Sequence, residues 1–253
     1  MPSLLSRIPA KIRRNLATRF ERRLLPVATS RPLISFTFDD APASAFVVGG
    51  DILRAHGGAA TYFLSLGLLG TTTEVGPIAD PGHLLRARED GHELACHTYD
   101  HLDAWYSSRS EYLASVDRNR ETLETLVPGA VFRSFAYPKS GPTVWVKGEL
   151  ARRFEACRGG GQCANIGRVD LNLVKACFLD RRTGIDLDTA RTLIDRNAEA
   201  RGWLVFATHD VAEDPSPYGC NTRFFEQTVD HAVRSGALIV PFAEACSKLR
   251  GTA

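Results

Sequence analysis

Two histidines and two adjacent aspartates are the residues of this chain whose types and spacing best suit chemistry at a metal ion. His97 and His101 lie four residues apart in the stretch Cys-His-Thr-Tyr-Asp-His at 96–101. On one turn of helix, or in a tight turn, this spacing places both imidazoles on the same side. Neutral imidazoles suit a borderline divalent ion, of which zinc is the commonest. We therefore expect the two histidines to share one divalent metal ion, with zinc as the first choice.

The pair Asp39 and Asp40 can supply the oxygen ligand that such an ion still needs. The pair ends the apolar run at 33–38, so it lies at a strand's carboxyl end if that run is a strand. Open α/β sheets place their chemistry there. Each piece alone has a structural alternative, since an aspartate pair after a strand is often a turn or a helix cap. The combination favours function, because four short motifs occur in order: Phe-Thr-Phe-Asp-Asp (36–40), His-Thr-x-x-His (97–101), Phe-Ala-Tyr-Pro (135–138) and Phe-Ala-Thr-His-Asp (206–210).

The elements that must position these motifs alternate along the chain. Apolar runs alternate with helical patterns after residue 31, and this order predicts parallel strands. Strands are expected at 33–38, 60–64, 93–96, 131–137, 171–179, 203–208 and 237–240. Helices are expected at 43–56, 84–90, 111–126, 144–156, 187–201, 224–234 and 242–249. The predicted fold class is α/β, an incomplete or distorted (β/α) barrel with about seven parallel strands.

Length and composition are consistent with one domain of this kind. The chain has 253 residues, of which 44% are hydrophobic and 24% charged, enough for one large core. Its net charge of +2 gives no reason to expect a nucleic-acid partner. No secretory signal or membrane-length apolar segment is recognisable, so we expect a cytoplasmic protein with its six cysteines reduced.

Residues 1–26 form a separate pattern, and we predict an N-terminal arm over 1–30 followed by the catalytic domain over 31–253. Apolar residues recur at intervals of four or three, and basic residues project elsewhere on the same helix. The arm either lies on the inner face of an anionic membrane or packs on its own domain or a partner subunit. The apolar residues are Leu5, Ile8, Ile12, Leu16, Phe20 and Leu24, and the basic ones are Arg7, Lys11, Arg14 and Arg22.

The four motifs, spread over residues 33–245, resemble those of the polysaccharide deacetylase family, the NodB homology domain or carbohydrate esterase family 4. The resemblance implies a distorted (β/α) barrel, one bound divalent metal, and hydrolysis of N-acetyl, less often O-acetyl, groups on sugars. Residue by residue, it implies that Asp39 is the general base and that Asp40 binds the metal with His97 and His101. His209 would be the general acid.

Several residues around these motifs are candidates for supporting roles. A backbone N–H in the segment Tyr137, Pro138 and Lys139 is expected to help stabilise the oxyanion. Trp105 either stacks on a sugar ring or packs its own loop. His209 needs a nearby carboxylate to favour its cationic form. The candidates for this carboxylate are Asp186, Asp195 and Asp210. The loop 214–220, which follows His209, is either a wall of the site or a rim without substrate contact.

Two positions depart from the common family pattern. Many members have glycine after the aspartate pair and an arginine in the third motif that pairs with the catalytic aspartate. Ala41 and Ala136 occupy these positions here. Arg133 lies three residues before Ala136, so on a strand it would point to the opposite face. The sequence therefore leaves open whether any arginine acts on Asp39.

Three classes of function follow from these residues. The first is a metal-dependent hydrolase of linear amides that removes acetyl groups from an amino-sugar glycan, oligosaccharide or saccharide precursor. The second is a metal-independent hydrolase of cyclic amides or ureides on the same fold, and the third is a catalytically silent glycan-binding module. The complete set of Asp39, Asp40, His97, His101 and His209 favours the first. A cytoplasmic location further favours a nucleotide- or lipid-linked saccharide, or a short oligosaccharide, and the oligomeric state stays open.

Overall fold

The centre of the fold is strand β2 (Leu33–Asp39), whose seven residues are all buried. The computed structural model of the protein describes residues 9–139 and 141–251. β2 pairs along its length with β11 (Trp203–Thr208), and on its other edge with β14 (Leu238–Ile239) and then β3 (Ala60–Leu64). A strand enclosed on both edges and both faces can carry a nearly continuous apolar run. This enclosure explains why the stretch before the aspartate pair is so apolar.

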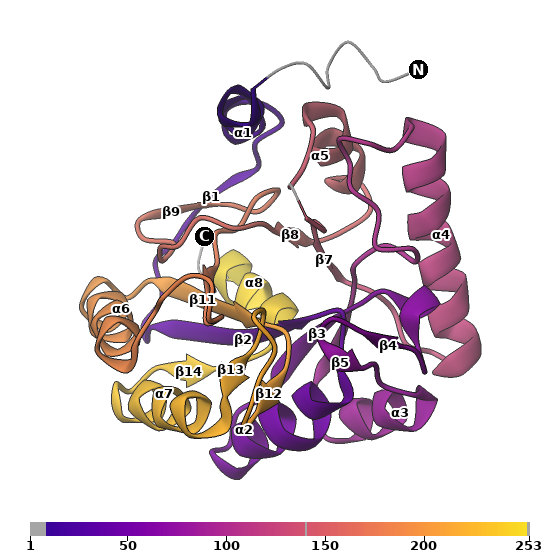
Figure 1. Cartoon of the computed structure of the whole chain (residues 1–253). Helices are drawn as coiled ribbons and strands as arrows, with labels where there is room; N and C mark the ends of the chain where they lie inside the picture. The colour runs from indigo at the N-terminus through magenta and orange to yellow at the C-terminus, as the bar shows by residue number, and fades with distance from the viewer. Residues whose placement is uncertain (1–8, 140, 252–253) are drawn as a thin grey trace.

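The main sheet has eight strands and forms an incomplete barrel (Figure 1). Seven of them follow the order β10-β11-β2-β3-β6-β7-β8, and β14 joins at β2. All pairings in this sheet are parallel, so the carboxyl ends of its strands open toward the same end of the barrel. The predicted fold class is therefore confirmed. The remaining strands of the order are β6 (Glu93–Cys96), β7 (Ser134–Ala136), β8 (Ala156–Arg158) and β10 (Cys177–Phe178).

Helices surround this sheet, and local side-chain caps start several of them (Figure 1). Ser108 accepts a hydrogen bond from the N–H of Glu111, whose side chain bonds back to Ser108, so the two form a capping box. Asp80, Thr143, Asp186 and Asn221 start other helices in similar ways. The helices are α2 (Asp51–Ala55), preceded by a π-helical stretch Ala45–Gly50, α3 (Pro81–Glu89), α4 (Arg109–Leu126), α5 (Val144–Leu150), α6 (Leu187–Ala200), α7 (Thr222–Arg234) and α8 (Phe242–Gly251).

The region between α5 and β11 differs most from the sequence-based prediction. The expected helix 144–156 ends at Leu150, and β8 follows it. The expected strand 171–179 is wrong, because only Cys177–Phe178 forms a strand and Arg168–Asp170 forms β9. These strands have only two or three residues, and two of them carry charged side chains, so no apolar run marks them. Two small sheets lie outside the main one. One is the antiparallel pair β4 (Thr72–Thr73) and β5 (Gly76–Pro77), and the other is the parallel pair β12 (Val211–Ala212) and β13 (Cys220–Asn221).

The N-terminal arm is not one helix over 1–26. Helix α1 (Ala10–Arg19) ends well before that, and Glu21 adopts a left-handed backbone with φ of 49°. β1 (Leu24–Pro26) then pairs antiparallel with β9, so the prediction that placed Arg22 and Leu24 on the helix is wrong. The predicted helical residues 1–8 lie outside the described part of the chain.

A buried lysine ties the end of α1 to the domain. Lys147 is fully buried on α5, and its Nζ donates to the carbonyl oxygens of Ala17 (2.8 Å) and Phe20 (3.0 Å). It also pairs with Asp170 of β9 at 2.6 Å. The second half of the arm is thus built into the domain. Within the described ranges, no helix combines the length and apolar character that crossing a membrane requires.

Candidate metal centre and active site

Asp40, His97 and His101 come together at the carboxyl ends of β2 and β6, as the sequence predicted. Their ligand atoms all lie within 4.8 Å of one another. The Oδ1 atom of Asp40 is 3.3 Å from Nε2 of His101 and 3.8 Å from Nε2 of His97. With bonds of about 2.0–2.1 Å, two ligands of one tetrahedral zinc lie about 3.4 Å apart. The three side chains therefore fit one ion after small shifts.

The orphaned carboxylate oxygen of Asp40 supports the same conclusion. Oδ1 of Asp40 is buried and accepts no hydrogen bond from any described residue. A buried polar atom without a partner is costly unless something outside the protein occupies it. Nδ1 of His97 donates to the carbonyl oxygen of Ala136 (2.9 Å), which leaves the lone pair of Nε2 facing Asp40. A backbone carbonyl that fixes the tautomer in this way is typical of metal-ligating histidines.

Both histidines are held in the neutral form that a metal requires. Burial lowers the pKa of His97 despite the neighbouring carboxylates. Burial and the adjacent His97 lower the pKa of His101 to about 4. Within the described chain, these histidines and Asp40 are the one cluster of three acidic, histidine or cysteine side chains with metal-binding geometry. All six cysteines are free and lie outside this cluster.

The loops around the centre have an unusual backbone. Five of the eight described non-glycine residues with positive φ belong to these loops: Asp40, Ala41, Thr98, His101 and Lys139. Such conformations cost about 1–3 kcal/mol each and concentrate at functional sites. Consecutive strand residues point to opposite faces, so the left-handed turn after β2 allows Asp39 and Asp40 to serve the same site. Ala41 has φ of 56°, a conformation that glycine adopts freely, which accounts for the glycine of many relatives.

Arg158 is the functional residue that the sequence did not identify. One of its guanidinium nitrogens, Nη2, lies 2.6 Å from both carboxylate oxygens of Asp39. The two side chains are only 2% and 5% exposed. Burial alone would raise the pKa of Asp39, but the charges of Arg158, His97 and His209 outweigh it, and the pKa is lowered. Asp39 is therefore a carboxylate throughout the neutral range.

The small residue at position 136 explains how Arg158 reaches Asp39. Ala136 of β7 and Arg158 of β8 are register partners on neighbouring parallel strands. The arginine of the usual third motif would start from position 136, and here the guanidinium comes from the next strand. Arg133 points away from the site and pairs with Glu155 at the surface. The one available signal was an arginine before three glycines, at the end of a strand too short to recognise.

His209 follows β11 and faces the metal ligands from the side opposite β6. Its Nδ1 donates to the carbonyl oxygen of Tyr218 (3.2 Å), and its Nε2 lies 3.9 Å from Oδ2 of Asp40. The expected carboxylate partners are wrong, because each is engaged elsewhere. Asp186 caps α6 and Asp195 pairs with His231, while Asp210 binds Ser216 and so holds the loop 214–220 against His209. Tyr218 of this loop contacts His209, which favours the interpretation of the loop as a wall of the site.

The segment 137–139 offers fewer oxyanion donors than expected. The N–H of Tyr137 donates to the carbonyl oxygen of Arg158 (3.1 Å), and its hydroxyl donates to that of Asn172. Pro138 has no N–H. The amide of Lys139 is therefore the remaining donor among the three. Lys139 is exposed, and its charge is one of the influences that lower the pKa of His101, so it lies beside the metal ligands.

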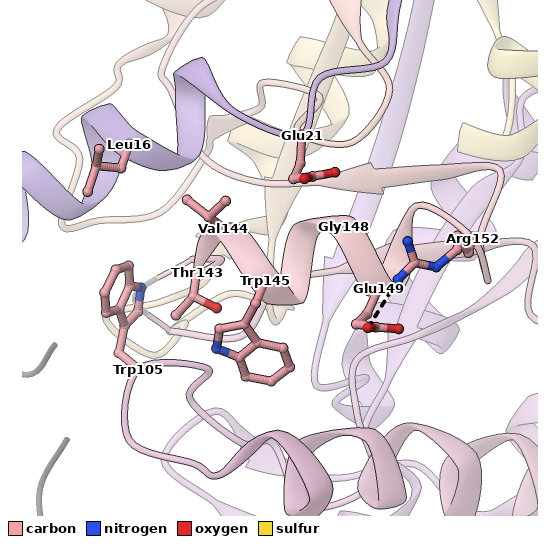
Figure 2. Close-up of a pocket in the computed structure, with 9 residues that line it drawn as sticks. All are labelled: Leu16, Glu21, Trp105, Thr143, Val144, Trp145, Gly148, Glu149 and Arg152. Carbon is pink, nitrogen blue, oxygen red and sulfur yellow. Dashed lines mark ion pairs between the residues drawn. The ribbon is translucent and has the colours of Figure 1, made fainter.

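Trp105 does not belong to the immediate surroundings of the metal ligands. It is half-buried and lines a separate cavity of about 460 Å³ with Trp145 of α5 (Figure 2). Its neighbour Tyr106 is 74% exposed and does not line this cavity. A second cavity of about 510 Å³ adjoins the site, with Tyr137, Lys139 and Arg158 in its lining.

Comparison with known proteins finds a family match over part of the chain. The family model described as polysaccharide deacetylase matches residues 27–151, which include Asp39, Asp40, His97 and His101. A probable peptidoglycan-N-acetylglucosamine deacetylase of Arthroderma benhamiae is 30% identical over 101 residues, 40% of this chain and 22% of that protein. The peptidoglycan-N-acetylglucosamine deacetylase PgdA of Listeria monocytogenes is 36% identical over 100 residues, 39% of this chain and 20% of that protein. The chain thus matches about a fifth of the length of these relatives.

Solved structures share the fold over most of the chain. The chitin deacetylase of Colletotrichum lindemuthianum superposes with a TM-score of 0.62 at 17% identity, covering 87% of this chain and 89% of that one. A family 4 carbohydrate esterase of Bacillus subtilis, PdaA, gives 0.59 at 12% identity, covering 93% and 88%. A pseudoenzyme of the same family from Bacillus anthracis gives 0.61 at 13% identity, covering 87% and 67%, so the shared fold alone does not establish activity. Residues 27–151 thus match the polysaccharide deacetylase family, and most of the chain shares the fold of its solved members.

Proposed function

We propose that this protein is a metal-dependent hydrolase that removes acetyl groups, N-acetyl above all, from an amino-sugar-containing saccharide. The arrangement around Asp39 carries this proposal. A buried carboxylate paired with Arg158 lies next to the Asp40, His97 and His101 cluster, and His209 faces the cluster from the other side. A structural ion pair would not need the orphaned Asp40 oxygen or the two neutral histidines beside it.

Amide hydrolysis needs a nucleophile and a proton for a poor leaving group, and the residues divide these tasks. A divalent ion held by Asp40, His97 and His101, with zinc as the first candidate, would polarise the acetyl carbonyl and make water acidic enough to react at neutral pH. Asp39 accepts a proton from the attacking water. Arg158 keeps that carboxylate ionised and oriented. The amide of Lys139 is the proposed donor of a hydrogen bond to the developing oxyanion.

His209 completes the reaction as the proton donor. Its Nδ1–H is held by the carbonyl of Tyr218, so the proton that its imidazolium form transfers is the one on Nε2, the nitrogen nearer Asp40. Transfer of this proton to the departing amine nitrogen makes cleavage of the C–N bond possible. An ester would need this proton less, because an alkoxide is a better leaving group than an amide anion. The pairing of a fixed histidine with the base therefore favours N-acetyl over O-acetyl substrates.

The proposal is tested by metal content and acetate release on the same preparations. We expect about one equivalent of zinc or another first-row metal in the native protein, and little in the Asp40→Ala and His97→Ala variants. His231→Ala is the matched control, because His231 pairs with Asp195 at the surface, away from the centre. Acetate release is then screened on N-acetylated saccharides from monosaccharides to polymers, including nucleotide- and lipid-linked precursors. Metal-free protein after reconstitution, with no acetate from any saccharide, would refute the proposal.

A further inference from the structure

The cavity lined by Trp105 and Trp145 lies between the N-terminal arm, α5 and the loop that follows His101 (Figure 2). Leu16 of α1 and Glu21 contribute to its lining from the arm, and Val144 contributes from the start of α5. The family match begins at residue 27, so the arm's share of this cavity comes from outside the matched region. Its volume of about 460 Å³ is within the usual range of ligand sites.

The lining combines flat apolar rings with charged groups at the edge. Two of the three tryptophans of the chain are here, both half-buried, whereas Trp203 is fully buried in the core. Trp145 packs edge-on against Tyr112, with ring centroids 6.2 Å apart, which fixes its orientation. Glu149, near the C-terminal end of α5, forms an ion pair of 3.0 Å with Arg152 just beyond the helix (Figure 2). Glu21 adds a carboxylate with no hydrogen bond or ion pair to any described residue.

This combination suits a saccharide better than a purely apolar ligand. A sugar ring has a face of C–H groups that packs on an indole and a rim of hydroxyl groups that need hydrogen-bonding partners. Tryptophan supplies a large apolar face and a polar N–H. Carboxylates and a guanidinium provide acceptors and donors for hydroxyl groups. An apolar segment of protein or lipid would instead cover the Glu21 carboxylate without giving it a partner.

Two loops connect this cavity to the metal centre. Trp105 follows the ligand His101 by four residues, so their Cα atoms are at most about 14 Å apart even in an extended chain. Thr143, which caps α5 and lines the cavity, follows Lys139 by four residues in the same way. An acetylated sugar at the metal centre and a later unit of the same chain in the cavity are therefore within reach of a short oligosaccharide.

We propose that the arm and α5 form a distal subsite that binds a non-reacting sugar unit of an oligosaccharide substrate. This inference rests on the proposed deacetylase function and narrows its substrate to chains of several units. It also gives the N-terminal arm a role in substrate binding. Lys147, which fixes the end of α1, then positions the wall of the subsite.

The test compares substrate length in variants of Trp145. The probes are β-1,4-linked oligomers of N-acetylglucosamine from one to six units. Trp145→Leu keeps an apolar side chain but removes the flat ring, and Trp145→Phe restores a ring. Tyr106→Ala is the matched control, because this exposed aromatic residue is adjacent to Trp105 but does not line the cavity. Thermal unfolding of each variant confirms that it is folded.

We expect kcat/KM of the native protein to rise with chain length. Trp145→Leu should lower the value for the hexamer roughly tenfold, leave the single sugar unchanged, and be largely rescued by Trp145→Phe. Isothermal titration of metal-free protein with the hexamer should show the same loss of affinity. Equal kcat/KM for all lengths, or an equal effect of Trp145→Leu on one and six units, overturns the subsite. If no saccharide releases acetate, the proposed deacetylase function fails, and the titration alone then tests the subsite. Weaker binding of the hexamer by Trp145→Leu than by the native protein supports the subsite. Equal binding by both proteins, or no binding by either, refutes it.

Discussion

Replacement of Arg158 by methionine should impair catalysis and stability together, because its partner Asp39 is nearly fully buried and would lose the charge that compensates its own. The pair is formed at 2.6 Å by side chains that are 2% and 5% exposed. Removing one partner of such a buried pair costs about 3–5 kcal/mol, since the other charge remains buried alone. One pKa unit corresponds to about 1.36 kcal/mol. If the cost falls on the ionised form of Asp39, its pKa rises by about two to four units.

This shift gives the substitution a signature in the pH profile. The pKa of Asp39 now lies below its usual 3.8, so the stability that its ionisation contributes is present above that value and lost as the pH falls through the folded-state pKa. In Arg158→Met, the acid limb of kcat/KM should move upward by about two units or more. Activity at neutral pH should fall on the order of a hundredfold, because the base is also less well positioned.

Three controls separate this explanation from general damage. Arg133→Met removes a surface arginine paired with Glu155 and should cost less than about 1 kcal/mol, with no change in activity. Arg158→Met combined with Asp39→Asn should unfold at higher denaturant than Arg158→Met alone, because no uncompensated charge remains at position 39. Arg158→Ala with Ala136→Arg should restore part of the activity, since the two positions are register partners. Unchanged activity and an unchanged acid limb in Arg158→Met would refute the reasoning.

Three further predictions follow from other contacts. Chelation should lower the melting temperature of the native protein, and added zinc should restore it, whereas Asp40→Asn should show neither change by calorimetry. Lys147→Met should lower the free energy of unfolding in denaturant by about 3 kcal/mol or more, because Asp170 and two carbonyls of the arm lose their lysine partner. Lys248→Met, at the surface, should lower it by less than about 1 kcal/mol. Equal losses in the two variants would contradict this prediction. Burial raises the pKa of Glu93 above its usual 4.5, so the folded state binds the extra proton and stability should fall as pH rises from about 4.5 toward the folded-state pKa. Glu93→Gln should lack this slope in unfolding measured across pH, and an identical slope in both proteins would contradict the prediction.

The sequence by itself determined the elements and residues that depend on local interactions. The strands at 60–64, 93–96 and 203–208 were predicted with the bounds that the structure has, because short, mostly buried runs next to turn residues define them. The metal ligands were recognisable because His97 and His101 are close in sequence and because Asp40 directly follows the apolar strand β2. The seven-strand barrel was predictable for the same reason, since alternation of strands and helices implies parallel pairing.

Only the tertiary structure decided which residue neutralises Asp39 and where the arm goes. Arg158 lies 119 residues after Asp39 and reaches it through the pairing of β7 with β8, two strands of three residues each. No periodic pattern marks so short a strand, and its register depends on neighbours that are distant in sequence. The arm's course depends likewise on Lys147 and β9, which lie more than a hundred residues away. Local propensity favours helix α1, but the hydrogen bonds from the buried Lys147 to Ala17 and Phe20 fix its last turn against α5.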